Sequence, residues 1–194
     1  MTVIVGIEHR GRVWIGGDSA GTDESGSQHN MLEPRKVFRV GDVLMGCAGS
    51  LRMAQVLAHG LKLPARDAPK SDESYLAIDF IAAVRELLQT AGCLCRQESG
   101  QDHLDGTLLI AYRGKLYTVD SDCNVNRNRK HFDAVGCGGR YARGALAVMT
   151  EPDPAKRVLA ALRATCSLNS DCRPPFVVLC DPPVGRRSRQ KAAR

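Results

Sequence analysis

The first eighteen residues of the chain, MTVIVGIEHRGRVWIGGD (residues 1–18), carry the pattern that decides the fold. Residues 3–7 and 12–16 are short runs of strand-forming side chains, and His9-Arg10-Gly11 between them is typical of a hairpin turn. Because a short hairpin joins antiparallel strands, the chain is predicted to begin with two neighbouring strands of an antiparallel sheet.

The rest of the chain continues in strand pairs and helix pairs. Further strands are predicted at residues 36–40, 43–47, 107–112, 115–120, 132–137 and 176–180. Helices are predicted at 50–61, 75–91, 140–149 and 154–166, with N-caps at Ser50 and Asp153 and with polar loops at 18–30 and 63–74. Hairpins imply antiparallel sheets, and helices that arrive in pairs cover them. We therefore predict an α+β fold, a four-layer αββα sandwich of two antiparallel sheets flanked by helix pairs.

Length and composition fit one globular domain. The 194 residues include 43% hydrophobic and 25% charged side chains, which excludes a disordered chain. Of the formal charge of +6, five positive charges lie in residues 185–194, so we predict one domain over 1–184 and a basic, disordered tail over 185–194. No apolar run approaches the ~18 residues of a membrane span, and the first apolar run lacks a basic leader, so a cytoplasmic protein without membrane contact is expected.

The eight cysteines of the chain are predicted to be free thiols. A chain expected in the cytoplasm has no use for a disulfide framework, and a free cysteine behaves as a small buried hydrophobe. None of them forms a Cys-x2-Cys pair with matching downstream ligands, so no metal site is expected.

Thr2 is the first candidate for chemistry. Methionine followed by a small residue is a likely substrate for methionine removal, which would leave Thr2 with a free α-amino group beside its own hydroxyl. Such an amine has a pKa near 7.7–8.0 and is able to act as general base toward the neighbouring oxygen. The hydroxyl is a weak nucleophile without that help.

Three further candidates follow within the first fifty residues. Asp18 ends the run Gly16-Gly17-Asp18 and Lys36 stands in Arg35-Lys36-Val37; a lysine held by Asp18 near Thr2 would favour a less protonated amine and hydroxyl. Residues 46–50, GCAGS, form a glycine-rich junction between a strand and a helix, whose backbone N–H groups are suited to an oxyanion.

Taken together, the N-terminal threonine, GGD, RKV and GCAGS resemble the active-site set of the proteasome β-subunit family, which belongs to the N-terminal nucleophile hydrolases. The resemblance is strongest to the bacterial branch around HslV and the betaproteobacterial proteasome homologue. It continues at residues 133–142, DAVGCGGRYA, and covers roughly residues 2–180. The predicted order of strands and helices agrees with the sandwich fold of that family.

The resemblance implies a role for each matching residue. Thr2 would be the nucleophile, Asp18 would orient Lys36, and Lys36 would lower the proton affinity at Thr2. The residues implied in oxyanion binding and substrate binding are Gly49 as the oxyanion donor, Gly21, Thr22 and Gly49 as backbone partners of an extended substrate, and Phe38, Met45 and Cys47 as the lining of the first specificity pocket. A bulky replacement of Cys47 should then change the cleavage preference. No cofactor is implied.

Three positions depart from the family pattern. Cys137 stands where the family usually places a serine that helps to hold the N-terminus, and a thiol is the poorer hydrogen-bond partner. Asn169 and Cys172 occupy the places of an aspartate and a serine near the end of the last helix, and asparagine carries no charge. These changes point toward a slow or inactive enzyme.

The resemblance implies a threonine peptidase that assembles with copies of itself into stacked rings. Its substrates would be peptides or unfolded chains, and an AAA+ unfoldase is a further partner that the resemblance admits. The departures at Cys137 and Asn169 leave open a catalytically silent ring or scaffold protein. The same fold also admits an N-terminal-threonine amidase for a small molecule. Nucleic acid is not an expected partner, because the positive charge is confined to residues 185–194; removing them should abolish any such binding.

Overall fold

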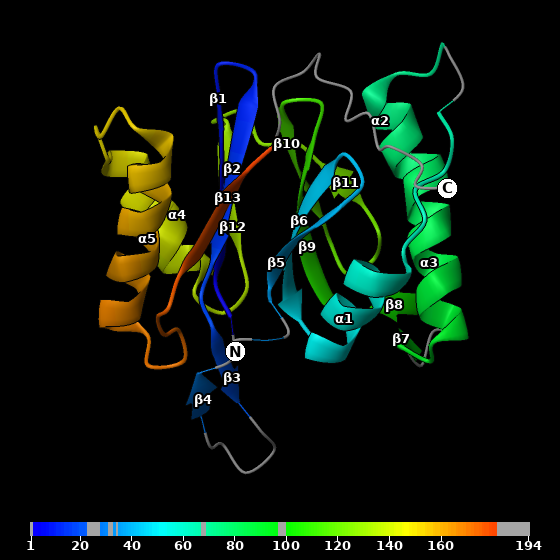
Figure 1. Cartoon of the computed structure of the whole chain (residues 1–194), viewed down its shortest axis with the longest axis horizontal. Helices are drawn as coiled ribbons and strands as arrows, with labels where there is room; N and C mark the ends of the chain where they lie inside the picture. The colour runs from blue at the N-terminus through cyan, green and yellow to red at the C-terminus, as the bar shows by residue number, and fades with distance from the viewer. Residues whose placement is uncertain are drawn as a thin grey trace, which may run out of the picture.

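The computed structural model describes residues 2–22, 28–30, 33, 35–66, 69–96 and 100–181. The tail predicted at 185–194 lies outside the described residues, as does Met1. Within the described part, two antiparallel sheets lie face to face, with α4 (Gly139–Val148) and α5 (Pro154–Leu168) on one side and α1 (Leu51–Gly60) and α3 (Ile81–Thr90) on the other (Figure 1). The predicted α+β class with antiparallel sheets is confirmed.

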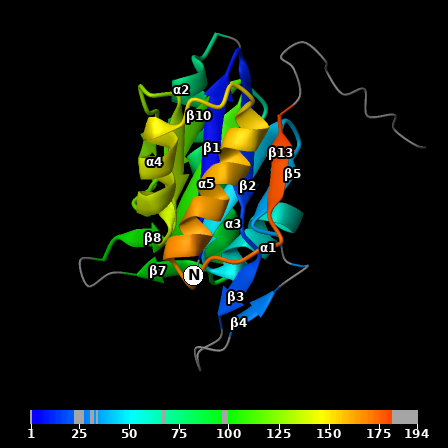
Figure 2. The ribbon, with the colours of Figure 1, turned by 90° about the vertical axis from the view of Figure 1, so that its left-hand side faces the viewer.

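The first sheet is built around the opening hairpin. Its order is β12 (Phe132–Val135), β1 (Ile4–His9), β2 (Arg12–Gly17) and β13 (Val177–Cys180), and every pair is antiparallel. Gly11 closes the β1–β2 turn with a positive φ of 69°, which glycine adopts without strain. Because β1 pairs with β12 on one side and with β2 on the other, it is an interior strand. Figure 2 shows α4 and α5 lying across the outer face of this sheet.

The second sheet has five strands. They are, in order, β11 (Val125–Asn126), β10 (Lys115–Val119), β9 (Gly106–Tyr112), β6 (Val43–Gly49) and β5 (Val37–Val40). The β5–β6 and β9–β10 hairpins, whose strands the sequence predicted, turn at Gly41 and Gly114, both with positive φ. Because side chains alternate along a strand, each sheet sends one face to the other sheet and one to its helices.

Apolar residues fill all three spaces between the layers. Val3 just ahead of β1 and Val5 and Ile7 on β1 pack toward α4 and α5, whereas Ile4 packs between the two sheets. Burial on both faces explains why the opening strand is a continuous apolar run rather than an alternating one. Met45 of β6 belongs to the third core, between the second sheet and the helices α1 and α3.

The helix ends follow the predicted caps. The Ser50 hydroxyl accepts a hydrogen bond from the Met53 backbone N–H at 3.3 Å, and Asp153 caps α5 just ahead of Pro154. The helix predicted at 75–91 begins earlier, at α2 (Asp72–Ser74) with Ser71 as its N-cap, and passes through a π-helical segment η1 (Tyr75–Phe80) before α3. Among the described residues, none of the helices is long and apolar enough to cross a bilayer.

The prediction of a continuous loop at residues 18–30 is wrong in part. The short strands β3 (Ala20–Thr22) and β4 (Gln28–Asn30) pair there, and a second small pair, β7 (Leu94–Arg96) with β8 (Asp102–Leu104), follows α3. Neither pair shows the alternation of polar and apolar residues that marks a half-buried strand. In Figure 1, β3 and β4 extend from the end of the sandwich at which the chain begins.

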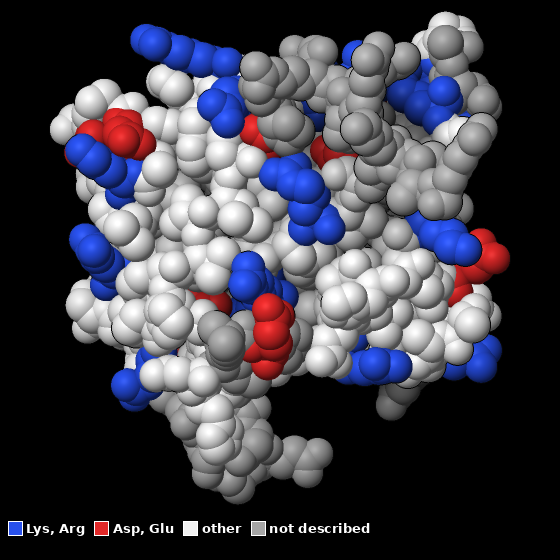
Figure 3. Space-filling view, viewed as in Figure 1, with Lys and Arg blue, Asp and Glu red and all other residues white. Residues whose placement is uncertain are grey.

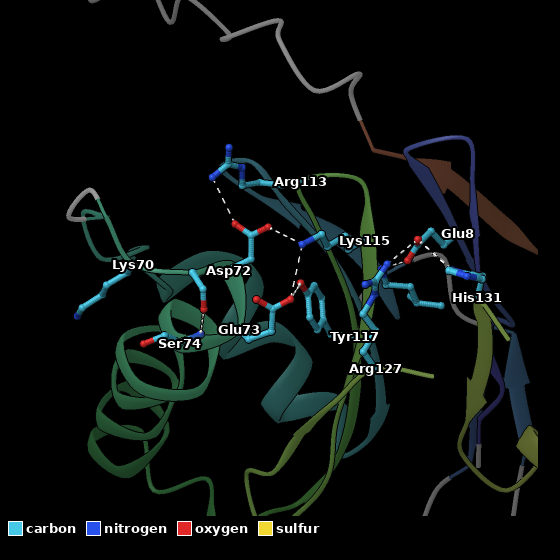
Figure 4. Close-up of polar contacts among 12 residues, drawn as sticks. Glu8, Lys70, Asp72, Glu73, Ser74, Arg113, Lys115, Tyr117, Arg127 and His131 are labelled. Carbon is cyan, nitrogen blue, oxygen red and sulfur yellow. Dashed lines mark hydrogen bonds and ion pairs between the residues drawn. The ribbon is translucent and has the colours of Figure 1, made fainter. Parts of the chain in front are cut away.

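Charged side chains join the layers at the other end of β1. Asp72 of α2 forms ion pairs with Arg113 at 3.3 Å and with Lys115 of β10 at 3.1 Å, as Figure 4 shows. Glu8 accepts from Arg127 at 2.7 Å. Burial raises the pKa of Glu8, but the hydrogen bonds from the Leu116 backbone and Arg127 outweigh it and hold that pKa below its ordinary value. On the face in Figure 3, basic side chains of the described part are scattered, with acidic ones beside several of them.

Candidate active site

The turn between β12 and α4 holds Thr2 through contacts with the Thr2 backbone. Thr2 lies two residues ahead of Ile4, the first residue of β1, and is 5% exposed. The Thr2 backbone nitrogen donates to Cys137 Sγ at 3.3 Å. The Thr2 carbonyl accepts from the Gly138 N–H at 3.3 Å and from the Cys137 thiol at 3.4 Å. Both backbone polar groups of Thr2 therefore find their partners in one turn.

Two glycines make this close approach possible. Gly136 has a φ of +90°, and a Cβ placed on it would lie 2.2 Å from the Thr2 carbonyl oxygen. A Cβ on Gly138 would lie 2.5 Å from Thr165 and 2.9 Å from Val3. The glycines of the motif GCGG (residues 136–139) therefore allow the turn to pack against the backbone at Thr2.

Replacing Gly136 by alanine is expected to displace Thr2. The new methyl group collides with backbone, and the positive φ adds about 1–3 kcal/mol of strain. For the nucleophilic role that the resemblance implies for Thr2, a displacement of about 1 Å costs on the order of 100-fold in rate, which a peptide-hydrolysis assay would measure. The matched control is Gly144→Ala inside α4, where a Cβ meets nothing within 4 Å and is expected to leave activity unchanged. Equal activity of both variants would contradict the expectation.

Asp18 connects the backbone beside Thr2 to Lys36. One carboxylate oxygen accepts from the Val3 N–H at 2.9 Å and the other from the Ala20 N–H at 3.0 Å. Both also accept from Lys36 Nζ at 3.0 Å. The side chains of Asp18 and Lys36 are 0% and 3% exposed, so this ion pair is sealed from solvent. The structure thus joins two of the sequence candidates, Asp18 and Lys36, and ties Asp18 to Val3, the residue that follows Thr2.

Gly49 lies at the end of β6, at the junction with α1. Its φ is +143°, and a Cβ on it would lie 2.1 Å from the Asp105 carbonyl oxygen. The next residue, Ser50, donates its backbone N–H to that same oxygen at 2.9 Å and caps α1. Only glycine fits this junction, and the residue itself is exposed, as an oxyanion donor needs to be.

Cys137 and Asn169 meet beside Thr2. Asn169 is the C-cap of α5, and its Nδ2 lies 3.8 Å from Cys137 Sγ, a long contact for a hydrogen bond. Its side-chain oxygen accepts instead from the Asp171 N–H at 2.9 Å. Asn169 therefore approaches Thr2 only through Cys137.

The predicted specificity residues lie on one face of the second sheet. Met45 and Cys47 are 0% and 3% exposed and belong to the core under α1, and Phe38 packs against that core. Burial, followed by the charge of Asp105, raises the pKa of the Cys47 thiol to about 12, so this thiol stays neutral. Gly21 pairs with His29 across the β3–β4 hairpin, and Thr22 pairs with Gln28.

Several residues of the site were not singled out from the sequence. Gly136 and Gly138 were quoted only as part of a motif, although each is required by a contact with Thr2 or its neighbour Val3. Cys172, which the sequence analysis named beside Asn169, is buried, and its sulfur lies 2.9 Å from the place of a Cβ on Gly138. The signal that was available is the density of glycine around Cys137. In the described part, no group of three or more His, Cys, Asp or Glu side chains is arranged to hold a metal ion.

The two facing sheets, with Thr2 ahead of an interior strand and beside a buried Asp–Lys pair, define the fold of the proteasome-type N-terminal nucleophile hydrolases. No family model matches the chain, and no curated protein sequence matches it. Solved structures do. BPH of Thiobacillus denitrificans in complex with epoxomicin superposes with a TM-score of 0.74 at 20% identity, over 95% of this chain and 100% of that one.

Two other solved structures share the fold. Eukaryotic HslV from Trypanosoma brucei has a TM-score of 0.65 at 20% identity, over 92% of this chain and 98% of that one. Anbu, an ancestral β-subunit from Yersinia bercovieri, has a TM-score of 0.63 at 14% identity, over 93% of this chain and 81% of that one. These structures agree with the family that the sequence motifs predicted, and they establish the fold.

Proposed function

We propose that the protein is a threonine peptidase whose nucleophile is Thr2, exposed as an N-terminal residue by removal of Met1. The observation that carries the proposal is the Asp18 carboxylate, which binds both the Val3 N–H and Lys36 in a site closed to solvent. A buried ion pair that only stabilised the sheets would have no need to hold the residue after Thr2. The similarity to a structure solved with epoxomicin supports the same conclusion.

Each residue then has a role in the reaction. The α-amine of Thr2 accepts the proton of its own hydroxyl as the oxygen attacks the scissile carbonyl, while Lys36 keeps positive charge nearby. The Gly49 N–H stabilises the oxyanion, and the amine returns the proton to the leaving nitrogen. Water, activated by the same α-amine, then hydrolyses the ester formed on the Thr2 oxygen. Asp18, Cys137 and Asn169 position these groups without touching the substrate.

The substrate is proposed to be an extended peptide or unfolded chain inside a ring of identical subunits. Gly21, Thr22 and Gly49 offer backbone groups near the site, and Phe38, Met45 and Cys47 would line the first pocket. Assembly into stacked rings, with an AAA+ unfoldase as a further partner, follows from the resemblance to HslV and its relatives. Light scattering of the purified chain tests this assembly, and a monomer at all concentrations would contradict it.

The proposed function is tested by intact-mass spectrometry before and after incubation with a peptide epoxyketone, which requires both a threonine hydroxyl and a free α-amine. We expect the mass of the chain without Met1, and one adduct per chain that maps to Thr2. A chain that keeps Met1, or a processed chain without an adduct, would overturn the proposal.

A processed chain without an adduct would favour a catalytically silent ring protein. One observation already supports this alternative. A sulfur, rather than an oxygen, accepts from the Thr2 nitrogen at 3.3 Å, and Asn169 Nδ2 lies 3.8 Å from it. Sulfur is a weaker hydrogen-bond acceptor than oxygen, so Thr2 is held less firmly than by a hydroxyl. Cys137→Ser, tested in the same adduct assay, would then label faster than the wild type.

The first specificity pocket is tested at Cys47. Because its side chain is buried, a bulky replacement overpacks the core at a cost of about 1–3 kcal/mol, so Cys47→Ala is the cleaner probe. We expect a shift of about 10-fold in preference toward larger side chains before the cleaved bond, measured with a peptide library. Cys123→Ala, a partly buried cysteine that packs at the edge of the same core, serves as the control. Identical library profiles for both variants would remove Cys47 from the pocket.

A further inference from the structure

A pocket of about 360 Å³ lies at the end of the sandwich opposite to Thr2. Its lining comes from three parts of the chain: the end of β1 with the β1–β2 turn, residues 130–132 at the start of β12, and α5. Figure 1 shows this turn at the far end of β1 from the N-terminus. An extended strand rises about 3.3 Å per residue, which places His9 roughly 20 Å from Thr2. The pocket is therefore separate from the candidate active site.

Basic and histidine side chains make up most of the lining of this pocket. They are His9, Arg10, Lys130, His131 and Arg157. Among the described residues, no carboxylate forms an ion pair with Arg10, Lys130 or Arg157, and the Arg157 guanidinium donates only to the Leu146 carbonyl oxygen, at 3.3 Å. Three positive charges thus line one hollow without a counter-charge of their own, and such a hollow attracts anions.

Glu8, the carboxylate in the lining, already has its partners. It accepts from Arg127 at 2.7 Å and from the Leu116 N–H at 3.1 Å, and it contacts His131 Nδ1 at 3.1 Å (Figure 4). Arg127 does not line the pocket, so the negative charge of Glu8 is balanced from outside. The contact with Nδ1 leaves the other ring nitrogen of His131 for a ligand.

Arg10 differs from its counterpart in the second sheet. Arg10 and Arg113 each precede a turn glycine and each has a φ of +50°, a conformation in which asparagine or glycine is less strained. Arg113 forms an ion pair with Asp72 at 3.3 Å, whereas Arg10 has no such partner in the described part of the chain. A charge held at this position without a partner in the fold points to a partner outside it.

Arg157 supplies a second, independent observation. Its Nε atom is buried and has no hydrogen-bond partner among the described residues, although the same side chain lines the pocket. Buried polar groups nearly always find a partner, because leaving one unmet is costly. A small turn of the guanidinium toward an anion in the pocket would give this N–H its partner. Arginine also offers two parallel N–H groups to a single phosphate.

We propose that this pocket binds the phosphate group of a small organic phosphate ester. Arg10, Lys130 and Arg157 come from three separate parts of the chain, and a phosphate presents three oxygens in different directions, whereas a carboxylate presents two in one plane. Ile7 and Phe132 add an apolar wall for the organic part, and the volume lies within the range of small-molecule sites. The site is independent of the proposed function.

The test is isothermal titration calorimetry of the full chain, supported by thermal-shift measurements, with inorganic phosphate, glucose 6-phosphate and AMP as probes. We expect at least one of the esters to bind about 10-fold more tightly than inorganic phosphate, because the ester also covers the apolar wall. Equal affinity for all three probes would overturn the assignment to an ester. Binding of none of them by either method would overturn the pocket as a phosphate site.

The double variant Arg10→Asn/Lys130→Gln tests the pocket directly. Both residues are exposed, and asparagine tolerates the positive φ at position 10, so the fold is expected to be kept. We expect ester binding to weaken by about 10-fold or more, because each substitution removes a charge-assisted hydrogen bond. The matched control is Arg113→Asn/Arg129→Gln, which removes the corresponding turn arginine and the neighbour of Lys130. Neither lines the pocket, so this control should bind as the wild type does.

A last control concerns the five positive charges of residues 185–194. Removing these residues is expected to leave ester binding unchanged. If binding is lost with them, or if both double variants weaken it equally, the positive charge acts without the pocket and the proposal is overturned. None of these measurements depends on Thr2, so a failure of the phosphate site and a failure of epoxyketone labelling are told apart.

Discussion

Replacing Thr2 by alanine is expected to abolish peptide hydrolysis and epoxyketone labelling while leaving the fold unchanged. The contacts that hold this residue, from Cys137 and Gly138, are made to its backbone, so alanine retains them. Alanine lacks the hydroxyl, and with it the nucleophile, together with the γ-methyl group. Loss of a catalytic nucleophile lowers the rate by about 10⁴-fold or more, which a fluorogenic peptide assay resolves.

The matched variant is Thr2→Ser, which keeps a hydroxyl beside the α-amine and a residue small enough for Met1 removal. We expect it to take up one epoxyketone and to retain measurable hydrolysis. Both variants lose the γ-methyl group of a buried residue and keep its backbone contacts, so both should lose a similar amount of stability, about 1 kcal/mol, in thermal unfolding. Hydrolysis by Thr2→Ala at the wild-type rate would assign the activity to another residue or to a contaminant.

Replacing Lys36 by methionine is expected to destabilise the protein by about 3–5 kcal/mol and to remove activity. Asp18, whose side chain is 0% exposed, would lose its cationic partner in the protein interior. For a chain of this size the loss corresponds to a fall of about 10 °C in the unfolding midpoint, measured by calorimetry.

Two controls separate the burial of the pair from its charge. Lys70→Met removes an ion pair with Asp79 whose side chains are 36% and 25% exposed, and should cost no more than about 1 kcal/mol. The double variant Asp18→Asn/Lys36→Met leaves no unpaired charge, so we expect it to regain stability but not activity. If Lys36→Met and Lys70→Met unfold at the same temperature, the Asp18–Lys36 pair does not support the site as described.

The parts of the fold that the sequence predicted are those that depend on local signals. The three long hairpins turn at Gly11, Gly41 and Gly114, each with a positive φ and each flanked by apolar strands. The helix caps at Ser50 and Asp153 are likewise short-range. Such features need no knowledge of the rest of the chain.

The parts that were missed depend on neighbours distant in sequence. The strands β3 and β4 are short and lack alternation, so nothing local distinguishes them from a loop. The π-helical segment η1 sits within an ordinary amphipathic pattern. For the site, Thr2, Asp18 and Lys36 were candidates from their own chemistry and took their roles from a resemblance. The proximity of Cys172 to Gly138, in contrast, arises only when the end of α5 packs against the turn before α4.

The position of β1 inside its sheet has a consequence for hydrogen exchange. Thr2 leads into a strand that is paired with β12 on one side and β2 on the other, rather than into an edge strand that frays on its own. Exposing the amides of this strand to solvent means opening two ladders together, so their opening free energy approaches that of global unfolding. The amides of Val5 and Ile7 should thus exchange among the slowest in the chain, and the proposed nucleophile keeps its place for as long as the first sheet does.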